Sequence, residues 1–129
     1  MVNPEFICEF TTNHMGNFNL LMQMVKKASE TGADYIKMQK KDVDTFYTQE
    51  KLNSPYSSPY GKTYGDYRRI FEFDKREFDY FDLECKKHNI KWFATAQDLP
   101  SLEFLLAYDL DMYKLASCNA NKRDLLTEC

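Results

Sequence analysis

The sequence contains no apolar run of 18 residues, so no segment is long enough to cross a membrane as a helix. Its N-terminus, MVNPEFICEF, lacks the basic stretch followed by an apolar one that marks a secretory signal. The formal net charge is only -3, and no run of like charge suggests a nucleic-acid arm or a polybasic membrane patch. We therefore expect a cytoplasmic protein that has neither nucleic acid nor membrane as a partner.

Residues that commonly bind metals or carry redox chemistry are also scarce. The two histidines form no H-E-x-x-H motif, and the four cysteines are widely spaced with no C-x-x-C pair. We expect reduced thiols used as small apolar residues, and no metal site built from this chain alone. The sequence also lacks a G-x-x-x-x-G-K-[ST] loop and a G-x-G-x-x-G turn, so neither of these phosphate-binding motifs is present.

The sequence instead alternates predicted strands with predicted helices. Short apolar segments predict strands at 6–10, 35–39, 90–95 and 112–117. Helices are predicted at 19–31, from 74, after 98 and from 122, and the first three follow the potential N-caps Asn17, Asp74 and Asp98. This order favours parallel strands in (β/α) units, the first half of a (β/α)8 barrel, which takes ~250 residues when whole. An open doubly wound sheet would give the same alternation.

The predicted connection between the second strand and the next helix, residues 40–73, is far longer than the ~2–6 residues usual for such loops. It is rich in turn residues and also in tyrosine, and this aromatic content argues against disorder. We expect a functional loop, or a surface that packs on another subunit of a homo-oligomer.

Three of the predicted strands carry a charge in their middle, at Glu9, Lys37 and Lys114. Buried parallel strands are usually apolar throughout, and an unpaired buried charge is costly. Side-chain alternation would let these residues and Gln39 form a polar ring at one mouth of a barrel. Two lysines there would suit an anionic small molecule. Alternatively, each lysine pairs with an acid or extends to the rim, and spacing alone does not separate the two.

At this point several motifs, in order along the chain, resemble the sialic acid (N-acetylneuraminate) synthase family. Each is weak alone, but five in register are specific. They are Ile7-Cys8-Glu9 followed by Asn13-His14-Met15-Gly16, then the stretch GADYIKMQ at 32–39, PYSS with GKTYG at 55–65, FATA at 93–96 and YKLAS at 113–117. The resemblance covers nearly the whole chain and implies the N-terminal half of a catalytic barrel over residues 1–129. Other phosphoenolpyruvate-condensing barrels are a weaker match.

The resemblance implies a synthase that condenses phosphoenolpyruvate with an N-acetylhexosamine such as N-acetylmannosamine and releases phosphate. Four residues would hold phosphoenolpyruvate: Lys37, Thr95, Lys114 and Ser117. Gln39, Asn13 and His14 would meet the sugar, and Glu9 would lie beside the reacting aldehyde or water as the catalytic carboxylate. These are suitable types, because lysines stabilise anionic charge and a carboxylate can orient water or move a proton.

Departures from the family pattern temper this expectation. Thr11 stands where the family usually has a glycine, and Asn119 stands where it has an acid, which affects sugar recognition. The family's divalent metal, Mn²⁺ or Mg²⁺, is held by residues of the second half of the barrel. That half and the C-terminal domain are absent from this sequence, so we expect the isolated chain to be inactive. The alternative is a non-catalytic half-barrel that serves as a binding or assembly module.

Overall fold

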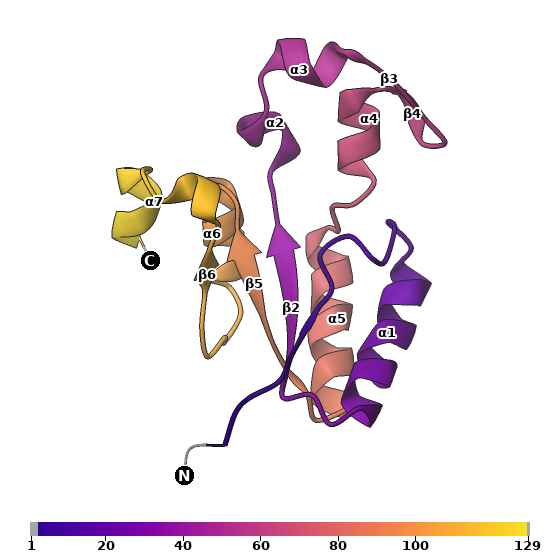
Figure 1. Cartoon of the computed structure of the whole chain (residues 1–129), viewed down its shortest axis with the longest axis vertical. Coiled ribbons are helices and arrows are strands. Elements are labelled where there is room, and N and C mark those ends of the chain that lie inside the picture. The colour runs from indigo at the N-terminus through magenta and orange to yellow at the C-terminus, as the bar shows by residue number, and fades with distance from the viewer. Residues whose placement is uncertain (1–2, 129) are drawn as a thin grey trace.

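The structure, a computed structural model, describes residues 3–128. Strands and helices alternate along the chain, with a group of short elements inserted in the middle (Figure 1). In chain order they are β1 (Ile7–Glu9), α1 (Phe18–Glu30), β2 (Tyr35–Lys40), α2 (Val43–Phe46), α3 (Gln49–Asn53), β3 (Pro55–Ser58), β4 (Gly61–Thr63), α4 (Tyr64–Arg69), α5 (Lys75–Lys87), β5 (Lys91–Ala96), α6 (Leu99–Leu105), β6 (Lys114–Leu115), the 3-10 helix η1 (Ser117–Asn119) and α7 (Arg123–Glu128).

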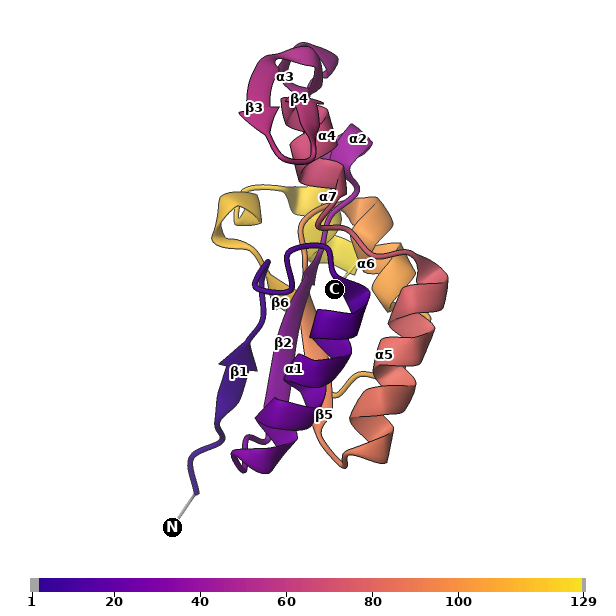
Figure 2. The same cartoon turned by 90° about the vertical axis from the view of Figure 1, so that its right-hand side faces the viewer.

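The four main strands form one parallel sheet in the order β1-β2-β5-β6. Each new strand is added on the same side of the previous one, so crossovers of one hand place the connecting helices on one face. Figure 2 shows α1, α5 and α6 on that face, and the other face is left for a barrel interior. A doubly wound sheet would reverse its strand order part-way. The observed order β1-β2-β5-β6 has no such reversal, and it confirms the half-barrel prediction.

The predicted helix starts are confirmed by their capping contacts. The Asn17 side chain accepts a hydrogen bond from the Leu20 amide at the start of α1. Asp74 and Glu77 form a capping box, in which each side chain accepts from the other residue's backbone amide. These contacts satisfy amides that a helix start leaves without partners, and so they set where each helix begins.

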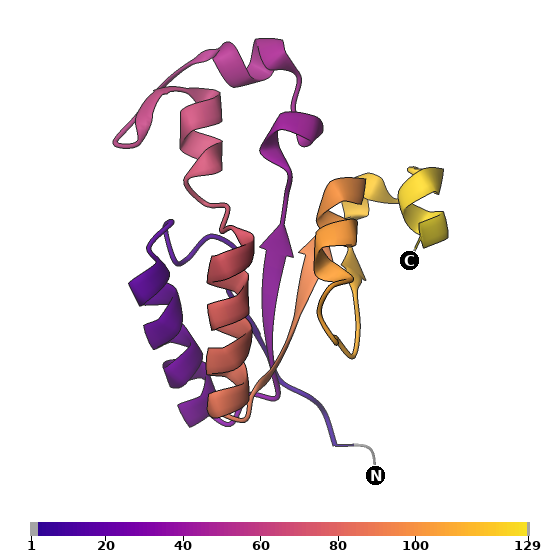
Figure 3. The same cartoon turned by 180° about the vertical axis from the view of Figure 1, so that it is seen from behind.

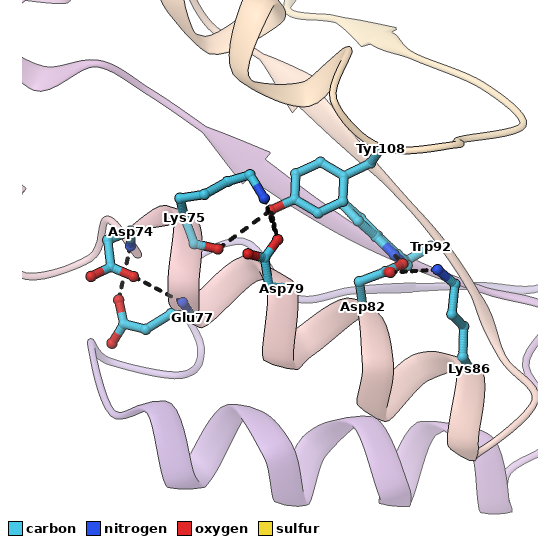
Figure 4. A network of polar contacts seen from close by, with 8 residues as sticks. All are labelled: Asp74, Lys75, Glu77, Asp79, Asp82, Lys86, Trp92 and Tyr108. Carbon is cyan, nitrogen blue, oxygen red and sulfur yellow. Dashed lines mark hydrogen bonds and ion pairs between the residues drawn. The ribbon is translucent and has the colours of Figure 1, made fainter.

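The core lies between the helices and the sheet. Phe78 and Phe81 of α5 are buried against Trp92 of β5, with ring centroids 5.9 and 5.1 Å from the indole. Figure 4 shows how α5 also holds this region through polar contacts. Asp82 accepts from the Trp92 indole nitrogen at 2.9 Å, and Asp79 accepts from the Tyr108 hydroxyl at 2.9 Å. Apolar burial and satisfied polar groups therefore fix α5 on the sheet.

The long connection is ordered, as its aromatic content predicted, and it contains secondary structure that the sequence did not predict. It folds into α2, α3, the β3–β4 hairpin and α4, and it stands beyond the C-terminal end of the sheet (Figures 1 and 3). Aromatic rings hold it together, with centroid distances of 5.3 Å for Tyr47–Tyr64 and 4.7 Å for Tyr56–Tyr67. The tyrosine content therefore supplies a small local core, because such pairs add to the stabilisation from burial.

The fourth strand is also shorter than predicted. Only Lys114 and Leu115 pair with β5, opposite Thr95 and Ala96. Since β5 ends at Ala96, residues beyond Leu115 have no ladder partner, and Ser117 begins the 3-10 helix η1 instead of ending the strand. Within residues 3–128, no helix is both long enough and apolar enough to cross a lipid bilayer.

Candidate functional site

The charged strand residues meet on the sheet face that the helices leave open. In the parallel register, Glu9 of β1 pairs with Lys37 of β2. One step nearer the C-terminal end of the sheet, Gln39 pairs with Thr95, which in turn pairs with Lys114. Paired residues of parallel strands share a face, so these five side chains form two neighbouring rows. The lower row consists of Glu9 and Lys37, and the upper row consists of Gln39, Thr95 and Lys114. This is the polar ring that strand alternation predicted, at the end where barrel enzymes place their sites.

Glu9 and Lys37 form an ion pair in the lower row. The Lys37 ammonium lies 2.8 Å from both Glu9 carboxylate oxygens, and the Thr11 hydroxyl donates to the same carboxylate at 2.6 Å. Partial burial acts to raise the pKa of Glu9, but the hydrogen bonds from Lys37 and Thr11 outweigh it, and the pKa lies below its usual value. Glu9 is therefore a carboxylate at neutral pH, and Lys37 pairs with an acid while lining the open face.

The upper row offers an unpaired hydroxyl and an accessible ammonium. Thr95 is buried, and its hydroxyl oxygen has no hydrogen-bond partner within the described part of the chain. Lys114 beside it is exposed and takes part in no ion pair with residues 3–128. Buried hydroxyls almost always find a partner, so an acceptor supplied by a ligand would complete this row. A donor and a cation side by side suit a phosphate or carboxylate.

The remaining predicted residues lie around these rows. Ser117 is exposed in η1, and Asn13 is exposed in the turn after β1. His14 is buried and accepts a hydrogen bond from the Gly16 amide at 3.1 Å. Its ring packs at a tilt against the core residue Phe73, with 4.6 Å between the ring centroids. Burial lowers the pKa of His14 below its usual value, which favours the neutral imidazole. The structure thus places His14 where it shapes the turn that carries Asn13.

Residues 24–129 match the NeuB family. The chain belongs to the NeuB family. Similar NeuB relatives include N-acetylneuraminate-9-phosphate synthases from Drosophila melanogaster, 34% identical over 93% of this chain, and from Homo sapiens, 30% identical over 89%. The N,N'-diacetyllegionaminic acid synthase of Campylobacter jejuni is 28% identical over 86%. The chain spans about a third of the length of these relatives, 33% for the first two and 34% for the third.

Solved structures share the fold of this chain. The N-acetylneuraminic acid (sialic acid) synthetase of Leptospira borgpetersenii superposes on 98% of this chain with a TM-score of 0.79 and 29% identity, and 41% of that chain is covered. The spore coat polysaccharide biosynthesis protein E from Chromobacterium violaceum, at 24% identity and a TM-score of 0.75, supports the fold alone. The observed strand order therefore corresponds to the N-terminal part of a sialic acid synthase barrel.

Asn119, which departs from the family pattern, is part of the framework in this NeuB chain. Its side chain is fully buried, and its amide nitrogen donates to the Gln97 carbonyl oxygen at 2.7 Å. A carboxylate at this position could not donate that hydrogen bond. Asn119 therefore ties η1, which contains Ser117, to the residue that follows β5.

Glu72 is a partly buried acid near the site, with 12% of its side chain exposed, that sequence reasoning missed. Its carboxylate accepts from the Lys41 backbone amide at 3.1 Å and lies 3.6 Å from the Lys40 ammonium. Burial raises the pKa of Glu72 to about 7, although Lys40 and the Lys41 amide act in the opposite direction. No periodic pattern identifies Glu72, because its partners belong to a strand end far away in the sequence.

Replacing Glu72 by glutamine is expected to flatten the pH dependence of stability. The folded state favours the protonated carboxyl, so the free energy of unfolding should fall as pH rises from the ordinary pKa of 4.5 through about 7. Urea unfolding midpoints at pH 5 and pH 8 measure this directly. The Glu72→Gln protein should lose less stability across that interval than the wild type, and Glu50→Gln at an exposed position is the control. Identical pH dependence in the wild type and Glu72→Gln would contradict the assignment.

Two other features of the NeuB chain bear on the choice of site. A cleft of about 550 Å³ lies at the N-terminal end of the sheet, where Lys91 and Asp111 form an ion pair at 2.5 Å. That end of a barrel serves stability, so we do not place the site there. Within residues 3–128, no three His, Cys, Asp or Glu side chains gather in a way that could hold a metal ion.

Proposed function

We propose that the chain is the N-terminal part of a nonulosonic acid synthase. This enzyme would join phosphoenolpyruvate to an N-acetylhexosamine such as N-acetylmannosamine and release phosphate. The observation that carries the proposal is that two rows of polar side chains lie together on the open face. The lower row is Glu9 and Lys37, and the upper row is Gln39, Thr95 and Lys114. Membership of the NeuB family and the synthase names of its relatives support the same reaction.

Phosphoenolpyruvate would occupy the upper row and the Lys37 ammonium. Lys37 and Lys114 would neutralise its phosphate and carboxylate, and the unpaired Thr95 hydroxyl would donate to one of their oxygens. Ser117, which is exposed at the start of η1, would add a further hydroxyl. Cations placed before the reaction stabilise charge that develops on the departing phosphate oxygen without further rearrangement. These residues would therefore both bind the substrate and lower the barrier to phosphate release.

The sugar would approach from the β1 and β2 side of the rows. Glu9 would lie next to the reacting aldehyde or water, where a carboxylate can orient water or transfer a proton. Its lowered pKa keeps it charged at neutral pH, which suits a base or an electrostatic role. Gln39 can donate to and accept from sugar hydroxyls, and Asn13 in the turn held by His14 would extend this contact.

The divalent metal expected from the family resemblance, Mn²⁺ or Mg²⁺, finds no ligand set in the described part of this chain. We therefore route no step through a metal here, and any such ligands would come from outside residues 3–128. This is why we propose that the 129-residue chain alone does not complete the reaction. We also propose a cytoplasmic location, where phosphoenolpyruvate is produced.

A chimera tests the proposed function. The chain would be joined to the part of the Leptospira borgpetersenii synthetase that follows the matched region, and assayed with phosphoenolpyruvate, N-acetylmannosamine and Mn²⁺. We expect the chimera to release phosphate, and the 129-residue chain alone to release none above background. A folded chimera without turnover would contradict the proposed function. Robust turnover by the chain alone would show that the site is located incorrectly.

The open strand edges favour association, as a homo-oligomer or as the alternative assembly module. Among residues 3–128, each of β1 and β6 pairs with only one neighbouring strand, so both outer edges of this sheet have no strand partner there. Such edges are templates for pairing with another chain, and Phe6 and Ile7 beside one of them are 67% and 50% exposed. Light scattering after size exclusion is expected to give a mass above 15.3 kDa at micromolar concentration. A monodisperse monomer that binds no hydrophobic dye would contradict this.

A further inference from the structure

The inserted segment, which runs from α2 to α4, meets the rest of the protein at a neck. The chain leaves the sheet at the end of β2 and returns just before α5, and the two crossings lie side by side (Figures 1 and 3). Within the segment, the helices and the hairpin pack chiefly on one another through their aromatic rings. A unit with its own small core, attached by two adjacent crossings, is suited to turn about them as one body. The contacts at the neck therefore decide where the segment stands.

One carboxylate joins the two crossings of the neck. Glu72, on the returning chain, accepts a hydrogen bond from the Lys41 amide on the leaving chain at 3.1 Å. The Lys40 ammonium lies 3.6 Å from the same carboxylate and donates to the Phe73 carbonyl oxygen at 2.8 Å. Both side chains of the ion pair are mostly buried, so water screens their charges little. If the crossings separate, the Lys41 amide loses its acceptor and Glu72 enters water.

The chain is anchored on both sides of this contact. On the leaving chain, the Asp42 amide donates at 2.9 Å to the buried carboxylate of Asp98, which also accepts from the Ser101 amide at the start of α6. On the returning chain, Phe73 is buried in the core. Asp42 and Phe73 therefore stay with the sheet when the segment turns. Glu72 lies just inside Phe73, at the point where a turn of the segment begins.

The charge of Glu72 is coupled to the position of the segment. Burial raises the pKa of Glu72 to about 7, although Lys40 and Lys41 act in the opposite direction. When the neck is open the carboxyl is hydrated, and its pKa returns towards the ordinary value of 4.5. The closed form therefore binds a proton more tightly than the open form. By linkage, the closed form loses stability relative to the open form as pH rises from 4.5 through about 7.

We propose that Glu72 is a proton-controlled latch of the inserted segment. With Glu72 protonated, the segment stays closed beyond the C-terminal end of the sheet, and ionisation of Glu72 favours its opening. The element that moves is the unit from α2 to α4, and the bond that breaks is the one between the Lys41 amide and Glu72. This inference goes beyond the proposed function, because it concerns access to the mouth and holds for whichever molecule binds there.

Other charged or titratable groups also meet at the neck. They are Lys40 and Lys41 at the end of β2, Arg68 on α4, His14 in the turn after β1 and Asp98 before α6. Burial lowers the pKa of His14 and of Lys41, so either group, if opening exposes it, favours the closed form as pH rises. Glu72 acts in the opposite direction, so the sign of the measured change identifies the group responsible.

Amide hydrogen exchange followed by NMR at pH 5 and pH 7.5 tests the latch in the 129-residue chain without any substrate. Protection factors, which correct for the intrinsic rate at each pH, should fall at least ~10-fold for the Lys41 amide between the two conditions. At pH 7.5 this amide should be at least ~10-fold less protected than the Phe81 amide in the middle of α5, which reports global unfolding. In Glu72→Gln the Lys41 protection should change by less than about twofold, whereas the exposed control Glu50→Gln should behave as the wild type.

Trypsin cleavage after Lys41 gives a second measurement at one pH. Lys41 is buried, so cleavage requires an open neck, and at pH 7.5 the wild type should be cut there at least ~10-fold faster than Glu72→Gln. Glu72→Gln should fold, because the folded state favours a neutral side chain at this position. Equal protection of Lys41 and Phe81 would overturn the latch, since the neck would then open only when the whole protein unfolds. The same fall with pH in Glu72→Gln as in the wild type, or no fall in either, would also overturn it.

Discussion

Replacing Lys37 by methionine is expected to weaken phosphoenolpyruvate binding by about 10- to 100-fold, which corresponds to ~1.4–2.7 kcal/mol. Lys37 is almost buried on the open face of the sheet, so its charge is shielded little by water. Methionine keeps the length of the side chain and removes the ammonium. Lys114→Met should cost at least ~10-fold, and less than Lys37→Met, because Lys114 is exposed.

Titration calorimetry with phosphoenolpyruvate measures both effects, and Lys26→Met on α1 is the control for loss of a positive charge. Lys37→Met also leaves Glu9 without its ion-pair partner, so the pKa of Glu9 should rise towards its usual value. Unchanged affinity in both Lys37→Met and Lys114→Met would remove the basis for the phosphoenolpyruvate site.

Replacing Phe78 by alanine is expected to lower the free energy of unfolding by about 3–5 kcal/mol. The Phe78 ring is 2% exposed and lies within 6.2 Å of the Phe81 and Tyr108 ring centroids. Its removal leaves a cavity between α5 and the sheet in addition to the lost burial. Leu83→Ala on the same helix is the control, because Leu83 is 60% exposed and should cost under about 1 kcal/mol.

Urea unfolding followed by tryptophan fluorescence reports this difference, since Trp92 packs directly against Phe78. A Phe78→Ala protein that loses no more stability than Leu83→Ala would mean that α5 does not form the central core contact.

The parts of the fold that the sequence predicted are those with regular periodicity or local capping chemistry. Helix α1 could be predicted from the spacing of Leu21 and Val25 after Asn17, and the start of α5 from Asp74 and Glu77. The meeting of Glu9 and Lys37 followed from strand alternation, because a period of two fixes which residues share a face. Parallel pairing was then enough to bring the charges together.

The parts that could not be predicted depend on contacts between distant residues. Helices α2, α3 and α4 are too short to show a helical period, and short helices form only when packing supports them. The burial of His14 depends on Phe73, and the approach of Lys41 and Arg68 to the same Tyr47 ring depends on how the inserted segment folds. A single sequence gives no local signal for such proximity.

The central claim is that phosphoenolpyruvate binds on the open face, at the C-terminal end of the sheet. Backbone amide chemical shifts recorded while phosphoenolpyruvate is added to the isotope-labelled protein test it most directly. The account predicts saturable shifts at Lys37, Thr95 and Lys114, with none at Lys91 or Asp111 in the cleft at the other end. Shifts confined to that cleft, or no saturable shifts at all, would contradict it.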